Sequence, residues 1–228
     1  MMRPVLLLLL LMMGLGSAQE STQKASATFY CFQYANGLKD IYVPTGEDRF
    51  QKLELSTANM LGPVSVLVRD GVLTLHDFVE TEEGEPSYPR IGTAKVKDIK
   101  RPLVVLLPGS EESTSRYGSL IIDRSETQFP QGSIQFINLT QHRIRALIGE
   151  TRLASTPGSV RNIKPTAPAG EMMIVLFEYE VDSRWRSMTK TRWASRPDRR
   201  SILCAYIDPR DNRAKMRSIP EREIPVSQ

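Results

Sequence analysis

The clearest pattern in the chain is the alternation of apolar and polar residues over short stretches bounded by turn residues. In the central stretch, 129–150, Ile134 and Phe136 fall on one face, and a second alternating run follows the polar residues 138–141. A period of two with many β-branched residues predicts strands rather than a helix. We therefore expect 129–150 to form a hairpin of two strands, which needs a second sheet to cover its apolar face.

The same alternation continues along the rest of the chain. Strands are predicted at 28–34, 38–43, 50–55, 64–68, 72–75, 103–107, 119–123, 171–182, 202–207 and 215–219. Asp70-Gly71 lies between two of these runs and predicts a two-residue hairpin turn with positive φ. No stretch longer than about ten residues has a clean helical period. The pattern predicts an all-β protein of the Ig-like β-sandwich type.

Two pairs of segments resemble each other at a spacing of about 100 residues. The stretch 101–108 resembles 200–209, and 32–43 resembles 136–149 in layout. One large sandwich and two tandem sandwiches are both compatible with this echo. For two domains we place the boundaries at 28–126 and 127–226, after a flexible leader at 19–27.

The N-terminal residues indicate the compartment. Arg3 gives a positive start, 5–13 is an apolar run, and Gly16-Ser17-Ala18 supplies small residues for cleavage after Ala18. This pattern predicts a secretory signal peptide at 1–18. An uncleaved anchor is the alternative, although the run is short for a membrane span. We expect an exported protein, periplasmic or secreted, without a transmembrane segment after cleavage.

Charge is distributed unevenly along the sequence. Residues 128–228 contain 17 Lys and Arg against 10 Asp and Glu, whereas 1–127 contain 13 against 16. An acidic and a basic half can face each other, or the basic half can meet an anionic partner.

The two cysteines, Cys31 and Cys204, are too few for a disulfide scaffold. Each lies in an apolar run that predicts a strand. An exported chain permits one bridge between them. Two free buried thiols are equally consistent with the sequence, because free cysteine behaves as a small core hydrophobe.

The run FPQGSIQFINLT at 129–140 is followed by Ile148-Gly149-Glu150 and a proline-rich loop. In these features the chain resembles uncharacterised exported β-sandwich proteins of planctomycete and verrucomicrobial type bacteria. The resemblance covers the C-terminal half. It implies export and an all-β fold, and it supplies no activity to transfer.

No catalytic signature is complete in the sequence. Ser187-Met-Thr-Lys190 matches the S-x-x-K pattern of serine acyl enzymes but lies between strands and lacks the companion motifs. His76 beside an acidic loop offers at most a weak cation site, and 208–212 is ordinary turn chemistry. We expect no catalytic residue, no metal and no cofactor.

The main candidate binding site is the basic segment at 184–200, in which cations alternate with two tryptophans. Its candidate residues are Arg184, Trp185, Arg186, Lys190, Arg192, Trp193, Arg199 and Arg200. Cations beside aromatic rings can bind phosphates, sulfated or acidic sugars, or nucleic acid, but tryptophans can also pack inward while the charges are solvated. In an unbroken strand the cations at 184, 186, 190 and 192 share one face, opposite both tryptophans.

These observations favour a non-enzymatic, exported binding or structural module of the cell envelope. We expect its partner to be an anionic polymer or another envelope protein, and not nucleic acid. The alternative is a cell-wall or carbohydrate-active hydrolase, because the carboxylates of glycosidases are distant in sequence and are assembled by the fold. The sequence does not give the oligomeric state.

Overall fold

The computed structural model describes residues 21–110 and 113–226. These residues form nineteen strands and no helix, so the prediction of an all-β fold is confirmed. Accordingly, the described part has no helix of the length and apolar character that crossing a membrane requires. The predicted signal peptide at 1–18 and the first two residues of the predicted leader lie outside the described residues.

The first half of the chain, together with β19 near the C-terminus, forms a nine-stranded sheet, which we call the first sheet. Its strands follow the order β10-β9-β1-β4-β5-β2-β3, with β8 paired to β5 and β19 paired to β4. The bounds of these strands are β1 Thr22–Cys31, β2 Asp40–Gly46, β3 Arg49–Glu54, β4 Met60–Arg69, β5 Val72–His76, β8 Arg90–Lys95, β9 Pro102–Pro108, β10 Tyr117–Asp123 and β19 Glu223–Ile224.

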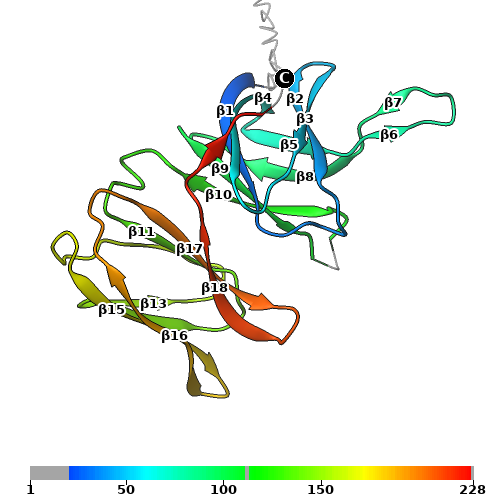
Figure 1. The fold of residues 1–228 in the computed structure, drawn as a ribbon. Coiled ribbons are helices and arrows are strands. Elements are labelled where there is room, and N and C mark those ends of the chain that lie inside the picture. Colours follow the sequence, from blue (N-terminus) through cyan, green and yellow to red (C-terminus); the bar gives the residue numbers. More distant parts are fainter. Residues whose placement is uncertain (1–20, 111–112, 227–228) are drawn as a thin grey trace, which may run out of the picture.

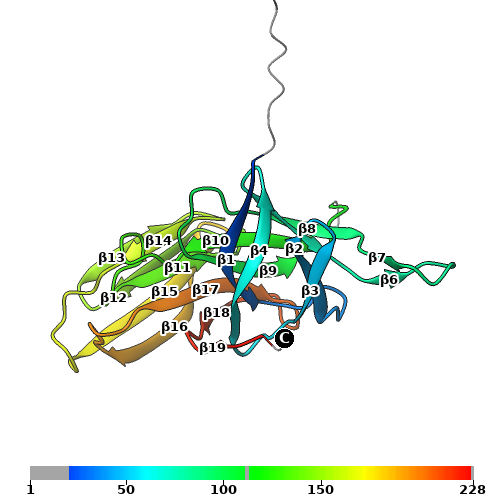
Figure 2. The ribbon, with the colours of Figure 1, turned by 90° about the horizontal axis from the view of Figure 1, so that it is seen from above.

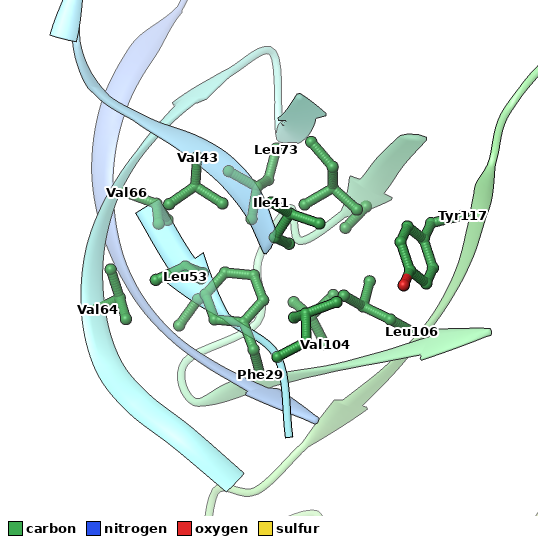
Figure 3. Packing of buried hydrophobic residues seen from close by; sticks show 14 of the residues in the cluster. Phe29, Ile41, Val43, Leu53, Val64, Val66, Leu73, Val104, Leu106 and Tyr117 are labelled. Atoms are coloured by element: carbon green, nitrogen blue, oxygen red, sulfur yellow. The ribbon is translucent and has the colours of Figure 1, made fainter. Parts of the chain in front are cut away.

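The first sheet curves around a core of its own. Strands β8 and β10 lie side by side, and the hydroxyl of Ser119 donates a hydrogen bond to the carbonyl of Thr93 at 2.7 Å. Figure 3 shows side chains such as Phe29, Ile41 and Leu53, all fully buried, gathered inside the curve. Burying one such side chain stabilises the fold by roughly 1.5–3 kcal/mol relative to leaving it in water.

Two local predictions in this half have different outcomes. The Asp70-Gly71 turn is confirmed, since both residues have positive φ, 49° and 76°, and Arg69 pairs with Val72. The flexible leader at 19–27 is wrong from Thr22 onward, because Thr22 pairs with Arg69 and the pairing continues along β1. Apart from Ala25 and Ala27, which contact the core of the first sheet, the side chains here are polar and exposed, so this part of the strand is defined mainly by its backbone hydrogen bonds to β4.

The second half of the chain forms a β-sandwich of two four-stranded sheets. We call them the middle sheet, of order β14-β11-β17-β18, and the outer sheet, of order β13-β12-β15-β16. The bounds of their strands are β11 Ile134–Asn138, β12 Ile144–Ile148, β13 Thr151–Ser155, β14 Val160–Ile163, β15 Met172–Val181, β16 Arg184–Ala194, β17 Ser201–Asp208 and β18 Arg213–Ile219. Phe136 of the middle sheet packs against Phe177 of the outer sheet inside this sandwich. The Ig-like strand arrangement stays a prediction.

The hairpin expected at 129–150 is wrong, although both of its strands exist. β11 belongs to the middle sheet and β12 to the outer sheet, so the chain crosses from one sheet to the other between them. Asn138 fixes this crossing. Its Nδ2 donates to the carbonyl of His142 at 2.8 Å, and its Oδ1 accepts from the amide and the hydroxyl of Thr140 at 3.0 and 2.7 Å. These bonds satisfy a side chain that is fully buried.

The first, middle and outer sheets form three successive layers (Figure 1). A separate core lies between the first and the middle sheet, where Tyr30 and Leu103 meet Ile137 and Ile202. The middle sheet is therefore covered on both faces, which explains why every residue of β11 is buried. A strand covered on both faces reads as a continuous apolar run rather than an alternating one.

Both cysteines are free and buried. Cys31 belongs to the core of the first sheet, and Cys204 belongs to the core between the first and the middle sheet. Burial raises the pKa of the Cys31 thiol to about 11 and that of Cys204 to about 12. The sequence was compatible with either a disulfide bridge or two free thiols, and in the structure both thiols are free.

The C-terminal segment returns from the sandwich to the first sheet. Glu223 and Ile224 of β19 pair with Met60 and Leu61 of β4. The carboxylate of Glu223 forms an ion pair with Arg124, whose side chain is nearly buried. Residues 223–224 fall within the predicted second domain at 127–226 but are strand residues of the first sheet. The division into two domains itself stays a prediction.

A hairpin projects from the first sheet. It consists of β6 (Val79–Glu80) and β7 (Pro86–Ser87) and stands away from the three layers (Figure 2). The acidic loop expected beside His76 lies at its tip, and residues 81–85 there are exposed. At its base Tyr88 stacks on Phe50, with ring centroids 4.2 Å apart.

Candidate functional site

Strand β16 positions most of the predicted basic segment. It is the edge strand of the outer sheet and pairs along its length with β15. Thr189 pairs with Phe177, but Ser187 pairs with Glu178, so Met188 is an extra residue without a partner. This is a β-bulge, and it reverses the faces to which residues on its two sides belong.

The bulge divides the four cations between the two faces of the sheet. Arg184 lies opposite Val181 and Arg186 opposite Tyr179, on the side that faces the middle sheet. Lys190 lies opposite Leu176 and Arg192 opposite Ile174, on the outer face. The prediction that the cations at 184, 186, 190 and 192 form a single row on one face is therefore wrong, because it required an unbroken strand.

The two tryptophans are also on different faces. Trp185 lies on the outer face, where the guanidinium of Arg145 sits 4.4 Å from its ring centroid. Trp193 lies on the inner face, half-buried against the sandwich core, and its ring is 6.2 Å from that of Phe177. Trp193 therefore packs inward, which was one of the two alternatives for the tryptophans. Trp185 instead forms a cation–π contact with Arg145.

Arg199 and Arg200 are neighbours in sequence with different roles. The side chain of Arg199 is 70% exposed, whereas that of Arg200 is 9% exposed. Arg200 donates through Nη1 to the carbonyls of Arg124 and Phe129, each at 3.1 Å, and through Nε to Glu221 at 2.9 Å. Its guanidinium also lies over the ring of Phe129. Arg200 therefore joins parts of the fold and is not available to a partner.

A pocket of about 350 Å³ lies at one end of the sandwich, and we call it the end pocket. Its walls are mainly apolar and come from five strands (β11, β15, β16, β17 and β18), from the loop that follows β16, and from Gly132 and Pro165 in two other loops. Its apolar and small lining residues are Gly132, Ile134, Pro165, Met173, Trp193, Ala194, Pro197 and Leu203. Arg196 and Arg199 are the only charged residues of the lining, and Ser195, Ser201 and Ser218 complete it. Two of the eight predicted site residues, Trp193 and Arg199, therefore line it.

Hydrogen bonds fix the loop that forms one wall of the end pocket. The hydroxyl of Ser195 donates to the carbonyl of Ala167 at 2.7 Å, and its amide donates to the carbonyl of Glu171 at 2.8 Å. On the other side the amide of Gly132 donates to the carbonyl of Arg199 at 3.0 Å. Gly132 has φ +75°, and a Cβ there would lie 2.9 Å from the carbonyl oxygen of Pro197. Only glycine fits this contact without strain.

The lining of the end pocket favours binding over catalysis. It contains no carboxylate, histidine, lysine or cysteine, so it offers no ordinary general acid or base. Apolar walls bind an apolar group, and the arginines attract a negative charge at the rim. The pocket is therefore suited to a ligand that combines an apolar part with an acidic group.

Two other groups considered in the sequence, His76 and the turn at 208–212, have structural partners. Nδ1 of His76 lies 2.7 Å from the carbonyl of Tyr88, and its Nε2 lies 2.9 Å from the hydroxyl of Thr74. Asp208 pairs with Lys215 at 2.6 Å, and this hydrogen bond holds the pKa of the Asp208 carboxyl below its usual value. Among the described residues, no group of three metal-ligating side chains is close enough to hold an ion.

No protein-family model matches this chain, and a comparison with curated proteins likewise found no match. The resemblance to exported bacterial β-sandwich proteins stays a prediction. The function must therefore be argued from the geometry and chemistry of the described residues.

Sequence reasoning missed most of the end pocket. Ile134, Met173 and Leu203 come from different strands and read as ordinary core positions. Their position at the open end of the sandwich depends on the pairing of distant strands, which leaves no local signal. Arg196 lies inside the predicted basic segment, and its exposed charge was the one available clue.

Proposed function

We propose that this protein is a non-enzymatic, exported binding module of the cell envelope that holds an anionic, partly apolar ligand in the end pocket. The main observation behind the proposal is the combination of apolar walls with a lining whose only charged residues are Arg196 and Arg199. The exposed carboxylate of Asp198 lies 3.8 Å from Nε of Arg199 but does not line the pocket. A volume of about 350 Å³ lies at the lower end of the range of ligand pockets, so we expect a small ligand or one group of a larger one.

A hydrolase is the weaker candidate. Glycosidases need two carboxylates that face each other across the scissile bond. None of five well-formed cavities in the described part of the chain is lined by more than one carboxylate, and the end pocket is lined by none. These cavities therefore give the hydrolase no observation in its favour.

The proposal is tested by titrating the mature protein with an anionic aromatic dye, anilinonaphthalene sulfonate, and with an uncharged dye of similar size. We expect the anionic dye to bind more tightly. Changing Arg196 and Arg199 to Ser should weaken its binding about tenfold, since each arginine contributes about 0.5–1 kcal/mol at an exposed rim. Binding of the uncharged dye should not change.

Two further variants complete this test. Ser201→Trp places a large ring at an exposed position of the pocket lining, on the same face of β17 as Leu203, and it should weaken binding of both dyes. The matched control changes Arg210 and Arg213, two exposed arginines that do not line the pocket, to Ser. Equal loss of binding in the rim variant and this control would refute the proposal.

A further inference from the structure

The outer face of the outer sheet carries an aliphatic patch, defined here by Leu147, Met172, Ile174 and Leu176. The strand register places Leu147 opposite Leu176, and Met172 and Ile174 follow on the same face of β15. Met172 is 56% exposed and Ile174 is 52% exposed. Scattered single apolar residues are normal on a surface, but a contiguous group indicates an interaction site.

Cations border this aliphatic patch on both sides. Lys190 lies opposite Leu176 and Arg192 opposite Ile174, whereas Arg152 lies opposite Leu147 on the far side. All three are exposed, and within the described residues none forms an ion pair with a carboxylate. Two glutamates, Glu150 and Glu171, lie in the turns beside the patch rather than on its strands.

The other half of the same face is different. Arg145 pairs with Glu178 at 2.6 Å, and Arg143 pairs with Glu180 at 3.2 Å. Cations and carboxylates neutralise each other there, so the unpaired positive charge of the face is concentrated around the aliphatic patch.

We propose that this half of the outer face docks onto the surface of a bilayer that contains anionic lipids. Arginine and lysine near such a surface are attracted to its negative headgroups, and exposed aliphatic side chains enter the interface between headgroups and acyl chains. The outer sheet is the layer farthest from the first sheet, so the projecting hairpin and the first sheet do not obstruct this face (Figure 1). The exposed cations on this face complement the negative headgroups, and the aliphatic side chains complement the acyl chains below them.

This inference goes beyond the binding of a ligand in the end pocket and does not depend on it. The two sites are neighbours, since Met172 and Arg192 adjoin the pocket residues Met173 and Trp193 along their strands. Their side chains point to opposite faces of the outer sheet, so variants of one site leave the other intact.

The experiment measures flotation of the mature protein with vesicles of phosphatidylcholine alone or with about 30% phosphatidylglycerol, a composition that gives a negative surface. We expect binding to the anionic vesicles only, and we expect it to weaken in about 0.5 M salt because salt screens exposed charges. Changing Lys190 and Arg192 to Ser should lower binding about 25-fold, at roughly a fivefold loss for each cation. Changing Met172 and Ile174 to Ser should lower it about tenfold.

The matched control is the variant with Arg184 and Arg186 changed to Ser. It removes two cations from the same strand, but from the other face, and should keep its binding. Equal losses in the two cation variants would overturn the proposal, as would binding to phosphatidylcholine alone. Binding that is unaffected by the Met172 and Ile174 changes and is reproduced by immobilised polyglutamate would overturn it in favour of an acidic protein.

Discussion

Replacing Arg200 by Met should destabilise the fold far more than replacing its neighbour Arg199 by Met. Methionine keeps much of the length and the apolar stem of arginine, so the packing over Phe129 is largely preserved. The guanidinium is lost, and with it three hydrogen bonds, to Glu221 and to the carbonyls of Arg124 and Phe129.

The magnitude follows from the groups that lose a partner. A buried carbonyl left without a donor costs about 1–3 kcal/mol. The side chain of Glu221 is 30% exposed and can regain water, so its loss is smaller than that of a buried charge. We expect Arg200→Met to lower the free energy of unfolding by about 3 kcal/mol, equivalent to a fall in Tm of roughly 6–12 °C for a protein of this size.

Urea unfolding followed by tryptophan fluorescence measures both variants under the same conditions. Arg199→Met should change the free energy of unfolding by less than about 0.5 kcal/mol, because its side chain is 70% exposed. Equal destabilisation by the two variants would show that Arg200 does not have the structural role described above.

Two other changes test the fold. Asn138→Ala should lower the free energy of unfolding by about 2–4 kcal/mol, because the chain crossing at 139–142 loses three hydrogen bonds. The control Gln141→Ala, at an exposed position of the same crossing, should change it by less than about 0.5 kcal/mol. Similar urea midpoints for the two variants would contradict this prediction. Stability should also fall as pH rises above about 9, because the unfolded chain releases the protons of Cys31 and Cys204 while burial keeps their folded pKa values at about 11 and about 12. A variant with both cysteines changed to Ala should lose part of this fall in urea midpoints between pH 8 and 11, and an identical pH dependence in the two proteins would refute it.

Local patterns predicted most of the strands because alternation is a property of neighbouring residues. The Asp70-Gly71 turn is a further example, since its positive φ values depend on only two residues. Local patterns do not predict which of those strands pair with each other. The sequence of β11 and β12 resembles a hairpin, but the two strands belong to different sheets. They are separated because segments that are distant in sequence pack on both faces of β11.

The basic segment shows the same limit at the level of single residues. Without the bulge at Met188, Trp193 would lie on the outer face with Trp185. The bulge brings Trp193 against the sandwich core and moves Lys190 and Arg192 to the outer face. Residues on both sides of Met188 alternate in the same way, so the sequence gives no sign of the shift. Arg199 and Arg200 are likewise indistinguishable in sequence, and only the tertiary contacts of Arg200 separate them.

The binding of a ligand in the end pocket can be tested directly through the two tryptophans. A two-dimensional ¹H–¹⁵N NMR spectrum of the protein prepared without residues 1–18 contains one indole N–H signal from Trp193, which lines the end pocket, and one from Trp185, which does not. On titration with anilinonaphthalene sulfonate we expect the signal of Trp193 to move in a saturable way while that of Trp185 stays in place. A saturable shift of Trp185 alone, or equal shifts of both signals, would contradict the proposed site.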